Sequence, residues 1–183
     1  LPYIEQEPLR KLSGNGSLQA QLRELVETPI KTINCPSRRA TRTYPVGADI
    51  IQPYWSEKPR FVAKTDYAMT LGHSHIDDPG PSDMNSMPSV RNMEGMVGRA
   101  FVVRAALVRD GLSNTYLLGE KYVWADWYTT TGDDNGDNEN AYIGSDRDTM
   151  RLSLQPSQDR PGYDNTYAFG SAHAGIFMMA FAD

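Results

Sequence analysis

Residues 100–123 read AFVVRAALV RDGLSN TYLLGEKYV, and this stretch carries the strongest β-strand signal of the chain. Residues 100–108 and 115–123 are rich in apolar and β-branched side chains, and the turn-forming pair Asp110-Gly111 lies between them. Two such runs around a short turn are typical of a hairpin. We therefore predict that Ala100–Val108 and Thr115–Val123 pair as antiparallel strands inside the main sheet.

The N-terminal part of the chain has a helical pattern. Four apolar residues lie at helical spacing and share one face: Leu18, Leu22, Leu25 and Val26. Ser17 is suited to cap the start of this helix, and Thr28-Pro29 is a stop signal. A shorter piece before it is interrupted by Pro8. The pattern predicts a helical segment in two pieces.

Three further runs are predicted as strands: Ile30–Asn34, Phe61–Leu71 and Gly175–Phe181, the last as a buried central strand. Residues 36–60, 72–99 and 128–149 have little periodicity and are predicted to be irregular loops. These features together predict an α+β fold over residues 1–183 as a single globular domain. Its N-terminal helical segment would pack on a mainly antiparallel sheet with long irregular loops.

Composition excludes several classes of protein. The chain has 183 residues and a formal net charge of −5 at pH 7, so it lacks the basic face of a general nucleic-acid binder. Its basic cluster, Arg38, Arg39 and Arg42, is interpreted as a solvated loop. No apolar run is long enough to span a membrane. The single cysteine, Cys35, is expected to be a buried apolar residue or to pair with a partner outside this chain.

The histidines are candidates for chemistry. His73 and His75 would face the same way on a strand, which is half of a transition-metal site, although a polar loop is the simpler interpretation. His173 follows Ser171 by two residues, but no nucleophile elbow is present. We expect His173 to be structural, to bond a backbone or carboxylate group, and to have no activated Ser, Cys or metal within reach. Cys35 has no sequence context that indicates a nucleophile.

An acidic loop is the candidate metal site. Residues 126–150 contain seven Asp or Glu residues and only one arginine. Oxygen ligands alternate along part of this loop, at Asp133, Asn135, Asp137 and Glu139. Calcium prefers such ligands, and their mutual repulsion favours a bound cation. The loop thus predicts calcium as a cofactor, with a solvated acidic loop as the alternative.

Aromatic residues suggest a second kind of ligand. The side chains able to stack on a sugar are Trp55, Trp124, Trp127 and Tyr128. Asp66, Asp110 and Glu120 lie beside apolar runs, but nothing in the sequence places two of them across a glycosidase cleft. A carbohydrate-binding module therefore remains an alternative, and catalytic residues are not predicted.

Several segments taken together resemble the planctomycete prepilin-like proteins, a family of unknown function named for a C-terminal His, nine residues, then Asp-Gly. Here nine residues separate His173 from Asp183, and residues 169–173 read FGSAH like the family's entry to that motif. DGLSNT at 110–115, with Glu120 close behind, is similar to another family block. LPYIEQ at 1–6, CPS at 35–37 and TDY at 65–67 follow the family's order.

This resemblance implies a type IV pilin-like or pseudopilin-like architecture. The chain would be the head, displayed outside the cytoplasm, and an upstream prepilin helix that this chain lacks would provide its link to the membrane. The motif residues are carried over as framework positions without a catalytic role: Asp66, Asp110, Glu120, His173 and Asp183. Buried hydrogen bonds at such positions would stabilise turns.

Three functions are consistent with these observations. We expect a non-enzymatic subunit of a pilin-like surface filament or secretion apparatus, which would self-assemble or contact related subunits. An extracytoplasmic module that binds a solute or carbohydrate is the alternative. A metal-dependent hydrolase that uses His73 and His75 is a distant third.

Overall fold

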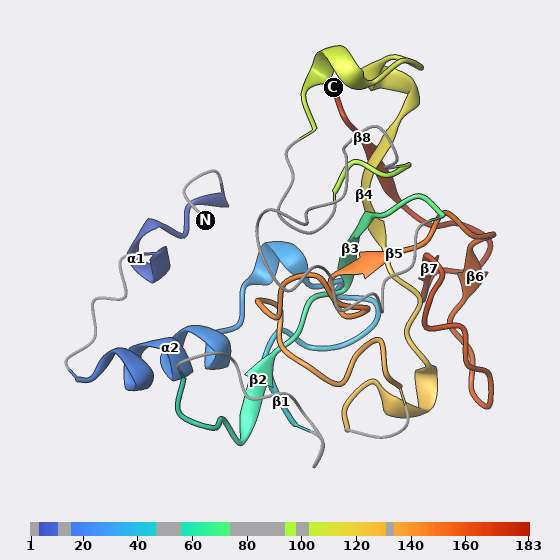
Figure 1. The fold of residues 1–183 in the computed structure, drawn as a ribbon. Helices are drawn as coiled ribbons and strands as arrows, with labels where there is room; N and C mark the ends of the chain where they lie inside the picture. Colours follow the sequence, from blue (N-terminus) through green and yellow to red (C-terminus); the bar gives the residue numbers. More distant parts are fainter. Residues whose placement is uncertain (1–3, 11–15, 47–55, 74–93, 98–102, 131–133) are drawn as a thin grey trace.

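The computed structural model describes residues 4–10, 16–46, 56–73, 94–97, 103–130 and 134–183. Its helices are α1 (Glu7–Arg10) and α2 (Leu18–Glu27), with the 3₁₀ helices η2 (Lys31–Ile33), η5 (Ala105–Leu107), η6 (Leu112–Asn114) and η7 (Ala125–Trp127). Its strands are β1 (Thr43–Pro45), β2 (Phe61–Ala63), β3 (Tyr67–Thr70), β4 (Tyr116–Glu120), β5 (Met150–Arg151), β6 (Ser157–Gln158), β7 (Gly170–Ser171) and β8 (Met179–Phe181). Figure 1 shows that short strands and connecting segments make up most of the molecule.

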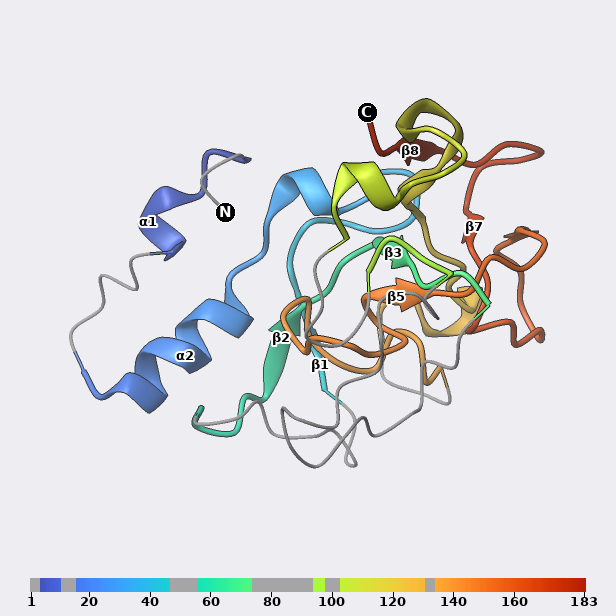
Figure 2. The same cartoon turned by 45° about the horizontal axis from the view of Figure 1, so that its top comes forward.

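The predicted N-terminal helices are confirmed. The Ser17 hydroxyl accepts a hydrogen bond from the Ala20 N–H at 3.2 Å, which caps α2 as expected. The helix ends at Glu27, and Thr28, directly before the proline, caps it. Val26 is buried, and α2 packs against β2, beside which it lies in Figures 1 and 2. Across the parts of the chain that the structure describes, no helix has the length and apolar character needed to cross a membrane.

The main sheet has four strands in the order β5-β3-β4-β8. β3 and β8 both pair antiparallel with β4, and β5 pairs parallel with β3. Two smaller sheets, β1-β2 and β6-β7, complete the described strands, and Figure 1 shows them beside the main sheet. The protein therefore has an α+β fold in which a short helix packs on a sheet, as predicted.

The predicted hairpin is wrong, although its second strand is present. Thr115–Val123 contains β4, but Ala105–Leu107 forms the 3₁₀ helix η5, and residues 100–102 lie outside the described ranges. Gly111, at φ 85°, leads directly into a second 3₁₀ helix, η6, so the connection is longer than a hairpin turn. β4 instead obtains its partners from β3 and β8, which are distant in sequence.

The three other predicted strands are also revised. Ile30–Asn34 contains the 3₁₀ helix η2, and Phe61–Leu71 divides into β2 and β3, which belong to different sheets. Gly175–Phe181 supplies only β8, which is an edge strand of the main sheet and not a buried central one. Its length and apolar character fit a central strand, but periodicity does not distinguish an edge from a centre.

The interior of the fold contains charged as well as apolar side chains. A small apolar cluster of Leu71 and Met150 lies between β3 and β5. Tyr44, Val62 and Tyr122 are also almost completely buried. Many charged side chains are buried with them, and each of these requires a partner of opposite charge.

Candidate functional site

A buried charge cluster surrounds Asp137. Its carboxylate accepts a hydrogen bond from Arg39 Nη2 at 2.9 Å, and Lys121 Nζ and Lys64 Nζ lie 3.0 and 3.2 Å from it. All four side chains are at most 1% exposed. Burial would raise the pKa of Asp137, but Arg39, Lys121 and Lys64 hold it well below its usual value. The carboxylate is therefore ionised and neutralised by cations of the protein itself.

The interpretation of the basic cluster as a solvated loop is wrong for its first two residues. Arg38 and Arg39 are buried, and their side chains are 0% exposed. Asp66 lies 2.7 Å from Arg39 Nη2, and Arg38 Nε donates to Asp159 at 2.8 Å. Burial would lower the pKa of both guanidinium groups, but the nearby carboxylates raise it. These arginines are stable in the interior because carboxylates that are distant in sequence but close in space compensate their charge.

The predicted calcium ligands do not share one environment. Asp137 forms ion pairs with Arg39, Lys64 and Lys121. Asn135 is exposed, and Asp133 lies outside the described ranges. The backbone N–H of the buried Glu139 donates to Asp148 at 2.9 Å. The repulsion expected among the loop carboxylates is thus relieved at Asp137 by Arg39 and two lysines. Calcium binding by the four residues stays a prediction, and the contacts of Asp137 with protein cations do not support it.

A different group of ligand-type side chains meets at the end of β4. Cys35 Sγ lies 3.6 Å from His173 Nε2, and Glu120 Oε1 lies 3.6 Å from the same nitrogen. The three atoms all lie within 4.8 Å of one another. Within the described ranges, no other three His, Cys, Asp or Glu side chains converge in this way.

Each member of this cluster is positioned by backbone and side-chain hydrogen bonds. Cys35 lies in a turn after η2, where its N–H donates to Asp66 at 2.8 Å. Glu120 ends β4, and its Oε2 accepts hydrogen bonds from Ser171 Oγ and the Met178 N–H, both at 2.9 Å. The N–H of His173 donates to Ser171 Oγ at 3.1 Å. Ser171 thus holds the Glu120 side chain and the backbone of His173.

The structure places a carboxylate, Glu120, beside His173, which is the kind of partner expected for it. It also brings Cys35 within 3.6 Å of His173, a contact that the sequence did not indicate, and whether this thiol is activated is the point that bears on the prediction. The arrangement does not resemble a catalytic triad, because the thiol and the carboxylate approach the same ring nitrogen. Burial also raises the pKa of Cys35, which disfavours a reactive thiolate. No local sequence signal indicates this cluster, since Cys35 and His173 are 138 residues apart.

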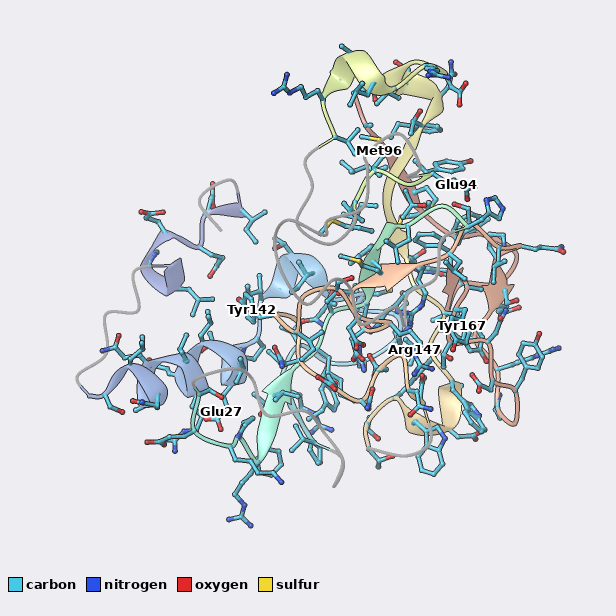
Figure 3. The ribbon with its side chains drawn as sticks, viewed as in Figure 1. Glu27, Glu94, Met96, Tyr142, Arg147 and Tyr167 are labelled. Carbon is cyan, nitrogen blue, oxygen red and sulfur yellow. The ribbon has the colours of Figure 1, made fainter. Side chains whose placement is uncertain are left out.

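The other candidate residues lie apart from this cluster. His73 is exposed and its Nδ1 lies 3.6 Å from Glu94, which is labelled in Figure 3. His75 lies outside the described ranges. Asp183 accepts a hydrogen bond from Ser113 Oγ at 2.8 Å, which connects the C-terminal motif to the turn before β4. Asp110 is exposed in the same turn.

The aromatic side chains do not form one open platform. The rings of Trp124 and Trp127 contact each other edge to face, with centroids 6.1 Å apart. The Tyr128 hydroxyl donates to Asp159 at 2.7 Å, and Trp55 lies outside the described ranges. In Figure 3 Tyr167 lies beside Arg147, whose guanidinium carbon is 5.1 Å from the ring centroid.

One face of the main sheet presents apolar side chains to solvent. Met69 pairs with Leu118 across β3 and β4, and the Tyr116 and Phe181 rings lie 4.9 Å apart across β4 and β8. All four side chains are between 37% and 47% exposed. We refer to these four residues as the apolar sheet face. A groove of about 260 Å³, lined in part by Met69 and Leu118, borders it.

Comparison with known proteins identifies a family but no better characterised relative. No curated protein and no solved structure matches this chain. A family model described as "Protein of unknown function (DUF1559)" matches residues 1–183. Because this match extends over all of residues 1–183, the chain belongs to this family of proteins of unknown function.

Proposed function

We propose that the protein is a non-enzymatic assembly subunit of a pilin-like surface structure, and that it packs on a second copy of itself through the apolar sheet face. The observation that carries this proposal is the exposure of Met69, Tyr116, Leu118 and Phe181 on one side of one sheet. Contiguous exposed apolar patches often mark surfaces that bind another protein.

The edge of the sheet strengthens the argument. β8 is the last strand on its side of the described sheet, so its outer backbone groups can pair with another strand. Met178 and Ile176, just before it, are 50% and 66% exposed. The apolar character thus continues from the face onto the edge, and a second copy that covers both would bury the whole region.

The resemblance to prepilin-like proteins supports the same function and a location outside the cytoplasm, where an upstream helix would connect the head to the membrane. The buried charge cluster fits a structural role, since its carboxylates and cations compensate each other. A carbohydrate-binding role has weaker support, because Trp124 and Trp127 contact each other. The exposed pair of His73 and Glu94 likewise gives a hydrolase little support.

Site-specific photo-crosslinking in the native cells tests this proposal. A photoreactive residue in place of Leu118 is expected to produce a cross-linked species of twice the subunit mass or a higher multiple. The matched control is Leu154, which is 41% exposed but lies in the loop after β5, and it is expected to give no such species. Both variants must retain the wild-type melting temperature. A monomer at position 118, or equal cross-linking at both positions, would refute self-assembly through this face.

A further inference from the structure

We propose that Cys35, Glu120 and His173 form a binding site for a single zinc ion. This site is independent of the assembly function proposed above. It differs in residues and in place from the calcium site that the acidic loop suggests.

The separations of the three ligand atoms fit a tetrahedral zinc centre. Zinc lies about 2.3 Å from a thiolate sulfur and about 2.0–2.1 Å from an imidazole nitrogen or carboxylate oxygen. Tetrahedral angles then separate sulfur from nitrogen by about 3.6 Å, and nitrogen from oxygen by about 3.4 Å. The observed separations from His173 Nε2 are 3.6 Å to Cys35 Sγ and 3.6 Å to Glu120 Oε1. The third separation, between Cys35 and Glu120, is no longer than 4.8 Å.

An independent observation is the orphaned oxygen of Glu120. This side chain is completely buried, and its Oε2 is occupied by Ser171 and by the Met178 N–H. Its Oε1 has no hydrogen-bond partner and lies nearest to His173. An unpaired buried carboxylate oxygen is costly, and a cation held against it would remove that cost. The hydrogen bonds to Oε2 are the outer contacts that orient a metal ligand.

The ligand types, a thiolate, an imidazole and a carboxylate, indicate which metal would bind. Thiolate and imidazole ligands favour zinc over calcium or magnesium, which prefer oxygen alone. Binding replaces the proton on the Cys35 thiol, which is released to solvent. Cys35 is 1% exposed, whereas the His173 side chain is 28% exposed. Zinc would therefore enter from the His173 side, and a water molecule would complete its four ligands.

Cobalt substitution and zinc titration test the site. Protein treated with a chelator is expected to bind one Co²⁺ with a sulfur-to-cobalt charge-transfer band, and Zn²⁺ is expected to abolish that band. Cys35→Ser should lose the band. Glu120→Gln and His173→Ala should each weaken zinc binding at least tenfold, measured by calorimetry. His73→Ala, which changes an exposed histidine outside the cluster, should leave zinc affinity unchanged.

A measurement on the wild-type chain covers the case in which a variant does not fold. Cys35 is the only cysteine, so its alkylation rate reports directly on the site. One equivalent of Zn²⁺ is expected to slow alkylation at least tenfold, and an equal amount of Ca²⁺ should have no effect. Unchanged alkylation with zinc, absence of the cobalt band, or equal loss of affinity in His73→Ala would each overturn the proposal.

Discussion

Removing the charge of Asp137 should destabilise the protein more than an ordinary surface substitution. Asp137→Asn preserves the size of the side chain but leaves Arg39, Lys64 and Lys121 with less compensation in the interior. Breaking a buried ion pair by removing one partner costs about 3–5 kcal/mol. Because total stabilities are roughly 5–15 kcal/mol, this loss is a large fraction of the free energy of unfolding.

The magnitude can be measured as a melting temperature. For a chain of this length, 1 kcal/mol corresponds to roughly 2–4 °C, so a decrease of about 6–20 °C is expected at pH 7. Calorimetry gives the melting temperature, and urea unfolding followed by circular dichroism gives the free energy. The matched control is Asp110→Asn, which removes an exposed carboxylate and should change stability by no more than about 0.5 kcal/mol.

The pH dependence gives a second criterion. The pKa of Asp137 is held well below its usual value by Arg39, Lys121 and Lys64, against the effect of burial. Its contribution to stability is therefore present above the unfolded pKa of about 4, and is lost as the pH falls through the folded pKa. The gap between wild type and Asp137→Asn should narrow below about pH 4. A variant within 1 kcal/mol of wild type at pH 7, or a gap that does not change with pH, would refute this reasoning.

Three further predictions concern separate parts of the fold. Burial raises the pKa of Asp148 to about 7, so ionisation of this carboxyl should lower the free energy of unfolding of the wild type as the pH rises from about 4 to about 7. Asp148→Asn should flatten this decline, measured by urea unfolding at each pH. Parallel pH profiles for the variant and the wild type would contradict the prediction. Gly170→Ala would place a Cβ 2.2 Å from the Ser157 carbonyl oxygen and should lower the free energy of unfolding by about 3 kcal/mol. Gly162→Ala, at φ 66° in open space, should lower it by about 1 kcal/mol. Equal losses of stability in thermal unfolding would contradict this prediction, because they would show that the β6-β7 contact can relax. Ser17→Ala removes the cap of α2 and should lower the free energy of unfolding by about 1 kcal/mol, which urea unfolding would detect.

The elements that were predicted correctly depend on neighbouring residues in the chain. The bounds of α2 follow from a capping serine, one apolar face and a stop before Pro29, all within thirteen residues of one another. β4 follows from its own run of apolar residues. Local signals of this kind were also sufficient for the α+β class, because helix and strand periods differ.

Long-range contacts account for what the sequence did not reveal. The partners of β4 come from β3 and β8, and no rule of local spacing selects them over the nearer residues 103–108. Arg38 and Arg39 resemble surface residues in sequence, but Asp66, Asp137 and Asp159 bring them into the interior. A charge is stable there only when its partner is present, and those partners lie 27 or more positions further along the chain.

The cluster at the end of β4 depends on tertiary contacts in the same way. Glu120 and His173 were identified from motifs as framework positions, and Cys35 as a buried residue. Their meeting requires that the turn after η2, the end of β4 and the turn after β7 come together, and hydrogen bonds from Ser171 and to Asp66 hold them there. Local sequence thus determines the chemical type of each side chain. The folded backbone determines which of them meet, because Cys35 and His173 are 138 residues apart in the sequence and lie 3.6 Å apart in the structure.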